Sequence, residues 1–283
     1  MLRYVQLAVE RSTGKVQLCL VWNSPGYRAA SPHLQLLVKE LKRREPDLFH
    51  SVWANFRMGP GNAIFNRDPY SWHRCFGLEF LREPIGPQKS LFYFSPPLFR
   101  QGNLDHFEKI VEAVVDLVPE GSRVCELYSG VGVLGLSVAH KAAWVRCSDV
   151  NDFIPRSFAR TRSRLSPEVQ ERVSFEALSA EEAVEDGEAE DCDVLIVDPP
   201  RKGLDAGVLE ALVDREDPNT SDLRKLVYVS CGFDALKKDA DALVKGGWTL
   251  SSAQGFVLFP GSDHIETLAV FDRPAPKVAA ASE

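Results

Sequence analysis

The chain has 283 residues, of which 45% are hydrophobic and 26% are charged, as in an ordinary globular protein with one large domain or two unequal ones. No apolar run approaches the roughly 18 residues that a membrane helix needs, so we expect no membrane partner. The net charge of -7 argues at first against nucleic acid. However, residues 1–100 carry 14 Lys and Arg against 7 Asp and Glu, a net of +7. Residues 1–100, the basic third of the chain, could bind the phosphates of a nucleic acid. The alternative is a basic surface that contacts only solvent.

The cysteines and the N-terminus bear on the compartment. None of the six cysteines forms a C-x-x-C pair, so we expect neither zinc nor an iron–sulfur cluster. Most of them lie inside apolar runs, as reduced buried thiols do in the cytoplasm or an organellar matrix. The first residues run directly into a strand-like pattern and show neither a signal peptide nor a transit peptide, although such a segment could precede this chain. The sequence leaves the oligomeric state open, and we expect a monomer.

Residues 1–95 have the pattern of an α+β domain with possible RNA contacts. Residues 5–9 and 16–21 flank Ser12-Thr13-Gly14, which predicts a hairpin. Ser31 is expected to cap a helix that ends before Pro46, and further strands are expected over residues 52–56 and 91–94. Pro96-Pro97 and the break near Gln101 then predict a linker over 96–104.

The pattern changes beyond residue 105 to alternating strands and helices. This alternation predicts an α/β fold, with a doubly wound and mostly parallel sheet over 105–273, followed by a flexible tail over 274–283. The carboxyl ends of three strands, where ligands of such sheets bind, carry Asp149, Asp198 and Cys231. We expect strands at 124–128, 144–148, 173–177, 194–197, 226–229, 256–258 and 267–271, and helices at 133–142, at 237–244 and through Arg156, Arg160 and Arg164.

A glycine-rich segment joins the first of these strands to its helix. Gly130, Gly132 and Gly135 fit the G-x-G-x-x-G pattern, in which glycines let the backbone approach a ligand and the helix offers free N–H groups. Asp149, about 20 residues further on, could take ribose hydroxyls. This arrangement suits NAD and S-adenosylmethionine equally, and a tight turn without any ligand is the plain alternative.

A second loop favours one of these cofactors. Asp198-Pro199-Pro200-Arg201-Lys202-Gly203 follows the fourth strand, and its two prolines stiffen the loop so that the carboxylate faces the crevice. Dehydrogenases do not need such a loop. Methyltransferases that act on planar nitrogenous substrates commonly have an acidic or amide residue followed by Pro-Pro at this place, which favours S-adenosylmethionine.

Over nearly its whole length the sequence resembles the RNA uracil-C5 methyltransferases, which make 5-methyluridine in tRNA and rRNA. The resemblance rests on five segments in the family's order and spacing. These are Ser95-Pro96-Pro97-Leu98-Phe99-Arg100-Gln101-Gly102-Asn103, Leu127-Tyr128-Ser129-Gly130-Val131-Gly132, Val197-Asp198-Pro199-Pro200-Arg201-Lys202-Gly203-Leu204, Tyr228-Val229-Ser230-Cys231, and Phe259-Pro260 to His264-Ile265-Glu266-Thr267.

The resemblance implies a Rossmann-like class I methyltransferase fold, S-adenosylmethionine as cofactor and tRNA or rRNA as partner. It also implies that Cys231 is a covalent nucleophile and Glu266 a base, whereas the alternatives are a core cysteine and a solvated strand-edge carboxylate. Arg201 could hold a phosphate or a base oxygen, or form a salt bridge. His264 would share a strand face with Glu266 if the strand is regular, and could orient substrate or be structural. The family further places Gln101, Tyr128, Asp149 and Asp198 at the cofactor or the target base.

The chemistry explains this choice of residues. Uracil C5 is a poor nucleophile until a thiolate adds at C6, and a base must then remove the C5 proton so that the thiolate can leave. The uridine must also leave its stack, and RNA contacts are expected in loops with aromatic stacking. Candidates in the basic third, for which core packing is the alternative, are Trp53, Phe56, Trp72 and Phe99.

The sequence also departs from the family pattern. Gly232-Phe233 stands where the family usually has Asn-Pro after the nucleophile, and Val133 stands where Asn or Thr often follows the second glycine. The N-terminal β-barrel and cysteine cluster of many members do not occur in this sequence, so this is either a minimal branch or a chain that starts after them. Two other functions stay open: a methyltransferase of this fold that acts on another RNA atom or a protein side chain without a covalent step, and an RNA-binding homologue without turnover.

Overall fold

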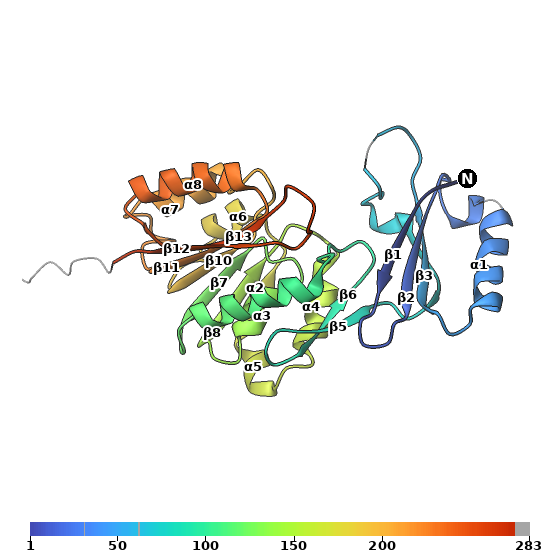
Figure 1. Ribbon diagram of the computed structural model, residues 1–283, viewed down its shortest axis with the longest axis horizontal. Helices are drawn as coiled ribbons and strands as arrows, with labels where there is room; N and C mark the ends of the chain where they lie inside the picture. The colour runs from blue at the N-terminus through green and yellow to red at the C-terminus, as the bar shows by residue number, and fades with distance from the viewer. Residues whose placement is uncertain (31, 62, 275–283) are drawn as a thin grey trace, which may run out of the picture. The chain divides into compact units, whose positions relative to one another are not determined.

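A computed structural model describes residues 1–30, 32–61 and 63–274. The chain divides into two compact units, which are described separately here (Figure 1). Unit 1 comprises Met1–Pro84 and Leu91–Arg100, and unit 2 comprises Ile85–Ser90 and the chain from Gln101 onward. The chain therefore passes between the units three times, and the predicted linker over 96–104 contains the last passage.

Unit 1 is built on a four-stranded sheet with the order β1-β2-β3-β4. The antiparallel β1 and β2 form the hairpin that the sequence predicts. β2 and β3 are parallel, and α1 connects them and packs on one face of the sheet, where Leu34 is fully buried (Figure 1). Ser31, the predicted cap of this helix, lies outside the described residues. The bounds are β1 Leu2–Val9, β2 Val16–Trp22, η1 Tyr27–Ala29, α1 Pro32–Arg44, β3 Phe49–Phe56, η2 Pro69–Ser71 and β4 Trp72–Gly77.

The hairpin β5–β6 carries the chain between the units. It comprises β5 Leu81–Ile85 and β6 Ser90–Phe94, which form a separate two-stranded sheet. The sequence predicts β6 but neither β5 nor β4. The missed β4 is only partly buried and mixes polar with apolar side chains, as Trp72-His73-Arg74-Cys75-Phe76-Gly77 shows, so it lacks a clear alternation.

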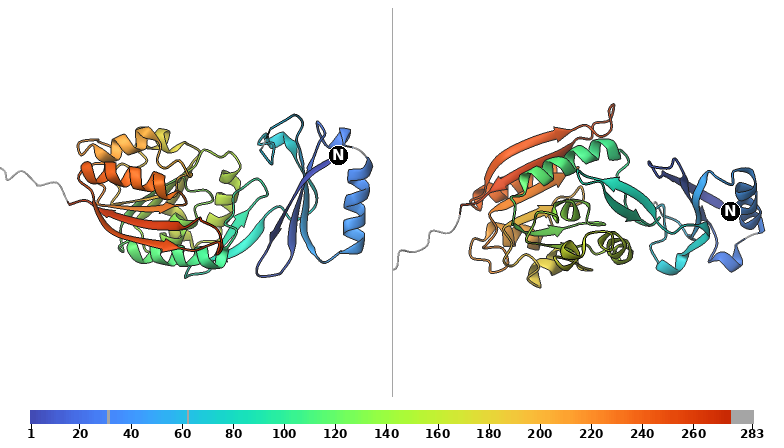
Figure 2. Two further views of the ribbon diagram at one scale, coloured as in Figure 1. Left: turned by 45° about the horizontal axis from the view of Figure 1, so that its top comes forward. Right: turned by 90° about the horizontal axis from the view of Figure 1, so that it is seen from below.

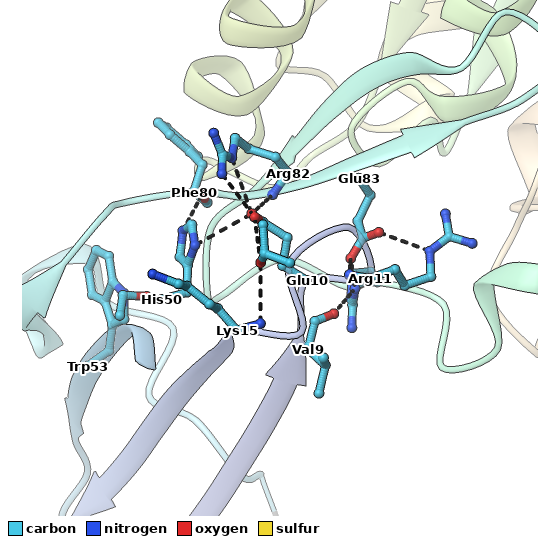
Figure 3. A network of polar contacts seen from close by, with 12 residues as sticks. Val9, Glu10, Arg11, Lys15, His50, Trp53, Phe80, Arg82 and Glu83 are labelled. Carbon is cyan, nitrogen blue, oxygen red and sulfur yellow. Dashed lines mark hydrogen bonds and ion pairs between the residues drawn. The ribbon is translucent and has the colours of Figure 1, made fainter. Parts of the chain in front are cut away.

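Two fully buried carboxylates, Glu10 and Glu83, tie the β1–β2 turn of unit 1 to β5 (Figure 3). Glu10 accepts hydrogen bonds from the backbone N–H of Arg82 at 2.9 Å and from its guanidinium at 3.0 Å. Glu83 accepts one from the guanidinium of Arg11 at 3.0 Å and another from Arg100. A buried carboxylate is tolerated only when it is paired and hydrogen-bonded, so these contacts fix the turn against the hairpin.

His50 extends the network on β3. Its Nδ1 lies 3.5 Å from Glu10 Oε2, and its Nε2 lies 2.7 Å from the carbonyl oxygen of Phe80 (Figure 3). Burial alone would raise the pKa of Glu10, but hydrogen bonds from Arg82 and Thr13 and the charge of His50 together hold it below its ordinary value of 4.5. The folded state therefore favours the ionised carboxylate.

Replacing Glu10 with Gln should destabilise unit 1 by about 1–3 kcal/mol, because the amide cannot pair with Arg82. Since the pKa of Glu10 is lowered on folding, its contribution is present above pH 4.5 and is lost as the pH falls through the lower pKa of the folded state. Hydrogen–deuterium exchange of peptides from β1 and β2 measures this local stability.

The matched control is Glu40→Gln, which breaks the exposed ion pairs of Glu40 with Arg43 and Arg44 on α1. Solvent screens such pairs, so the control should exchange like the wild type. Equal protection in the Glu10→Gln variant and the control would contradict the structural role of Glu10.

Unit 2 contains a seven-stranded sheet with the order β12-β13-β11-β10-β7-β8-β9. Its strands are parallel from β11 to β9, and β13 runs antiparallel to both β11 and β12. The carboxyl ends of the parallel strands consequently share one edge, and the order reverses between β7 and β10, where ligands of open α/β sheets bind. The bounds are β7 Arg123–Leu127, β8 Trp144–Ser148, β9 Val173–Glu176, β10 Val194–Val197, β11 Lys225–Ser230, β12 Thr249–Phe256 and β13 Glu266–Asp272.

Helices cover both faces of this sheet, as the predicted α/β fold requires (Figures 1 and 2). Apolar residues of α6, α7 and α8 pack with strand residues such as Leu127, Leu195 and Tyr228 in one buried cluster. On the other face, α3 lies over β7 and packs against α2. None of the described helices is both long and apolar enough to cross a membrane. The bounds are α2 Leu104–Leu117, α3 Val133–Val138, α4 Ile154–Arg162, α5 Pro167–Glu171, α6 Ala180–Glu185, α7 Ala206–Val213 and α8 Phe233–Lys245.

Several predicted elements of unit 2 have different bounds in the structure. The helix expected over 133–142 ends at Val138, and the backbone N–H of Lys141 then donates to the carbonyl of Val138 in a turn. The helix expected over 237–244 begins earlier, at Phe233, and the helix expected through Arg164 ends at Arg162. The strand expected over 256–258 is instead β12, which ends at Phe256. Most of β12 is exposed and polar, so its sequence carries no apolar pattern. Apart from Pro274, the predicted tail lies outside the described residues.

Candidate active site

Strand register brings the two predicted catalytic residues together. Ser230, the last residue of β11, pairs with Thr267 of β13. Cys231 follows β11 directly, and Glu266 is the first residue of β13, so the same antiparallel register sets them opposite each other. Asp198 follows β10, the next strand of the sheet, and therefore reaches the same edge.

The charges in this cluster act on one another. Burial raises the pKa of the Cys231 thiol, and the nearby Glu266 and Asp198 raise it further, whereas the charge of Arg201 and its hydrogen bond to the thiol lower it. Burial also raises the pKa of Glu266, whereas the charges of Arg201 and His264 lower it. Burial and the charge of Glu266 raise the pKa of Asp198 to about 7. The site therefore holds a thiol and two proton-accepting carboxyl groups around one guanidinium.

The loop that carries Asp198 and Arg201 is anchored on α8. The backbone N–H of Leu204 donates to Asp239 Oδ2 at 2.9 Å, and the hydroxyl of Tyr228 donates to the same oxygen at 2.8 Å. Gly203 needs its φ of 87° here, and a Cβ at this position would meet Asp239 at 2.5 Å. Sequence reasoning missed Asp239. The sequence signal that could have identified Asp239 is an acidic residue on the apolar face of an amphipathic helix.

Gly232 leaves room for this loop beside Cys231. A Cβ at this position would lie 2.6 Å from the carbonyl oxygen of Arg201, a distance that real side chains do not adopt. The Asn that the family usually has here would therefore collide with the Arg201 backbone. The departure at Gly232 is thus coupled to the position of the loop that brings Arg201 to Cys231.

The glycine-rich loop forms a second polar cluster at the same edge, after β7 and β8. Tyr128, Gly130 and Gly132 adopt positive φ angles of 57°, 54° and 77°. The N–H of Gly130 donates to Asp149 Oδ2 at 2.9 Å, and the N–H of Asn151 donates to Oδ1 at 3.0 Å. A Cβ on Gly130 would meet no atom within 4 Å, so open space borders the loop beside the Asp149 carboxylate.

The structure also describes the remaining predicted site residues. The hydroxyl of Tyr128 donates to the Asp205 carboxylate at 3.1 Å and accepts from the Asp205 N–H at 3.0 Å, a partner that sequence reasoning missed. Gln101 is half-buried just before α2. His264 lies in the loop before β13 and not on the strand, so the expected strand face shared with Glu266 does not exist. Its ring is exposed and lies 3.7 Å from Asp263.

Glu126 is a further buried acid beneath the glycine-rich loop, and the sequence reasoning gave it no role. Its carboxyl group accepts the N–H of Gly135 at 2.9 Å and lies 3.4 Å from the Cys147 sulfur. Burial raises the pKa of Glu126 to about 8. A Cβ on Gly135 would lie 2.6 Å from this carboxyl group, so the third glycine of the pattern serves the packing of α3 on β7.

This fold is that of the S-adenosylmethionine-dependent methyltransferases. It is similar to a putative methyltransferase of this class from Streptococcus mutans, with a TM-score of 0.52 over 90% of this chain and 69% of that one. At 11% sequence identity this likeness concerns the fold alone. The model of the tRNA (uracil-5-)-methyltransferase family matches residues 73–273, and the chain belongs to that family.

Relatives of the family cover nearly the whole chain. An uncharacterized RNA methyltransferase of Protochlamydia amoebophila is 38% identical over 96% of this chain and 68% of its own length. A tRNA (uracil-54, C5)-methyltransferase of Pyrococcus abyssi, solved with S-adenosyl-L-homocysteine, is 25% identical, with a TM-score of 0.72 over 95% of this chain and 59% of that one. The chain spans about half the length of other curated relatives, such as an RNA methyltransferase of Geobacter sulfurreducens, which it covers to 53%.

The raised pKa of Glu126 makes a prediction about stability. The folded state holds the proton more tightly than the unfolded chain, so this carboxyl group stabilises the fold below pH 4.5 and the benefit is lost as the pH rises through about 8. Glu126→Gln keeps the neutral form and should remove this decline, with stability at acidic pH within about 1 kcal/mol of the wild type and above that of the wild type at alkaline pH. Urea denaturation at acidic and alkaline pH measures the difference.

The comparison variant is Glu126→Ala, which deletes the acceptor of the Gly135 N–H and leaves a cavity. It should lower the free energy of unfolding by about 2–4 kcal/mol at acidic pH, and the difference from the wild type should shrink as the pH rises. If Glu126→Gln destabilised the protein as much as Glu126→Ala, the carboxyl group would be ionised and the interpretation would be wrong.

Proposed function

We propose that this protein transfers a methyl group from S-adenosylmethionine to C5 of a uridine in tRNA or rRNA, through a covalent adduct on Cys231 and with Glu266 as base. The observation that carries the proposal is the β11–β13 register, which sets a thiol opposite a carboxylate at the ligand-binding edge of the sheet. Family membership and the likeness to the Pyrococcus abyssi enzyme support it. The net charge of +7 over residues 1–100 supports an RNA partner.

The glycine-rich loop and Asp149 fit S-adenosylmethionine. Each oxygen of the Asp149 carboxylate takes one backbone N–H and keeps acceptor capacity for a ribose hydroxyl beside the open space at Gly130. Gly132 belongs to the same loop. The other residues that we propose contact the cofactor are Gln101, Tyr128 and Asp198. When bound, the cofactor supplies an electrophilic methyl group on a sulfonium centre.

Cys231 starts the proposed reaction. Its thiol loses a proton to solvent, and the thiolate adds to C6 of the uracil, which turns C5 into a nucleophilic enolate carbon that takes the methyl group. Arg201 favours the thiolate, because its hydrogen bond and charge oppose the burial and the two carboxylates that raise the thiol pKa. In this proposal Arg201 also neutralises the oxygen of the enolate, and His264 contacts the substrate.

Glu266 completes the proposed reaction. It takes the proton from C5, the electron pair of the C5–H bond restores the C5–C6 double bond, and the C6–S bond breaks to release the thiolate. Because burial raises the pKa of Glu266, its carboxylate is a stronger base than a solvated one. Asp198 lies near Glu266, and its pKa is raised to about 7. In this proposal its carboxyl group exchanges a hydrogen bond with a nitrogen or oxygen of the uracil.

Cys231→Ala should abolish methyl transfer, because C5 stays unreactive without a thiolate at C6. Wild-type protein incubated with S-adenosylmethionine and with tRNA or rRNA transcripts that contain 5-fluorouridine should form a stable adduct, since the C5 fluorine cannot leave as a proton. Denaturing gel electrophoresis reveals the adduct, and tritium from the labelled methyl group measures transfer on ordinary transcripts.

Cys75→Ala is the matched control, because Cys75 is a partly buried free thiol of unit 1. It should form adduct and transfer methyl groups like the wild type. Methylation that persists in Cys231→Ala without any adduct in the wild type would indicate the non-covalent alternative. RNA binding without any transfer would indicate a homologue that has lost turnover.

Glu266→Gln should stall the reaction after methyl transfer, because the amide cannot remove the C5 proton. Turnover should fall by about 10²–10⁴-fold, and an adduct that carries the labelled methyl group should accumulate on ordinary uridine RNA. Asp263→Asn, which changes an exposed carboxylate in the loop before β13, should behave like the wild type. Free methylated RNA released at the wild-type rate by Glu266→Gln would exclude Glu266 as the base.

A further inference from the structure

Phe233 lies on the apolar stripe of α8 but is not buried. The stripe continues at intervals of three and four residues through Leu236, Ala240 and Leu243, which pack in the core of unit 2. Leu236 is 5% exposed and Leu243 is fully buried, whereas 66% of Phe233 is exposed. The helix thus presents an aromatic ring in line with its buried face, and the fold leaves that ring uncovered.

The position of the helix start explains this exposure. α8 begins at Phe233, directly beyond the carboxyl end of β11, and its packing on the sheet begins one turn later. Phe233 is separated from Cys231 only by Gly232, so the ring belongs to the segment that bears the nucleophile. Gly232 is the N-cap residue of α8, and a Cβ at this position would collide with the Arg201 carbonyl oxygen.

A bare aromatic ring at this place is not explained by folding. Removing apolar surface from water is favourable, and the exposed 66% of Phe233 gains none of this stabilisation from the fold. A proline, which the family usually has here, is well suited to the first position of a helix and would offer no flat aromatic face. The change to Phe therefore adds a stacking surface beside the nucleophile.

We propose that Phe233 stacks on a nucleobase of the substrate RNA while the target uridine occupies the site at Cys231. This inference rests on the proposed function and deepens it, because it assigns a residue that positions the RNA. The base that stacks on Phe233 must be bound at the same time as the target uridine. The nucleotides next to that uridine in the same RNA strand meet this condition. Aromatic stacking on such bases is a common and sequence-tolerant means of holding single-stranded RNA.

The test compares RNA binding by the full chain and three variants, measured as fluorescence anisotropy of a labelled uridine-rich single-stranded RNA. A second probe is an abasic RNA of the same length, which keeps the phosphates but offers no ring to stack on. Phe233→Leu should weaken binding of the base-bearing RNA by about 10-fold and leave binding of the abasic RNA unchanged. Phe233→Tyr should bind within about twofold of the wild type, because it keeps the stacking face.

Val244→Ala is the matched control, because Val244 is an exposed apolar residue at the other end of α8. It should bind both RNAs like the wild type. The inference is overturned if Phe233→Leu binds the base-bearing RNA as well as the wild type does, if it weakens both RNAs equally, or if Phe233→Tyr is as weak as Phe233→Leu. It also fails if the wild type does not distinguish base-bearing from abasic RNA.

Methyl transfer from the labelled cofactor, measured in parallel, separates this inference from the proposed function. Absent transfer by the wild type, together with the expected binding pattern, would refute the methyltransferase reaction and leave the stacking role in place. Normal transfer by the wild type, together with no effect of Phe233→Leu on binding, would refute the stacking role alone.

Discussion

The antiparallel pairing of β11 with β13 is the constraint on which the candidate site depends. Ser230 faces Thr267 in that pairing, so the next residues outward, Cys231 and Glu266, meet at the edge of the sheet. A slip of one residue would turn every side chain of β13 to the opposite face and would remove the carboxylate from the thiol. Both faces of β13 are buried, so a slip would move Phe271 into space that Leu268 and Val270 fill, and this packing holds the register. Core packing thereby fixes a distance that the chemistry needs.

The second constraint is electrostatic. Asp198 and Glu266 both lie near Cys231, and each raises the pKa of the thiol, so the edge of the sheet favours protonated groups. Arg201 counters this effect, and a Cβ at position 232 would collide with its carbonyl oxygen. The glycine at this position, where the sequence departs from the family pattern, therefore leaves room for the loop of Arg201.

The sequence was sufficient for much of the fold but not for every contact. Buried parallel strands such as 194–197 carry continuous apolar runs, and motifs such as Asp198-Pro199-Pro200 mark their ends, so both were predictable. β12 was misplaced because an exposed edge strand has no apolar alternation. The partners of Asp239 and of Tyr128 were not predictable, because they depend on how α7, α8 and the intervening loops pack. His264 was assigned to a strand that begins two residues later.

Unit 2 shows why burial and a shifted pKa do not by themselves identify a catalytic acid. Glu126 and Asp198 both follow the pattern of a carboxyl group whose pKa is raised by burial, to about 8 and about 7. The carboxyl group of Glu126, however, is occupied by the Gly135 N–H and the Cys147 sulfur beneath α3, where no substrate can reach it. Asp198 lies at the end of β10, on the edge where Cys231 and Glu266 meet, and its shift comes partly from Glu266. Position relative to the strand ends, and not the size of the shift, therefore separates the enclosed acid Glu126 from Asp198, the acid to which we assign a role in the proposed reaction.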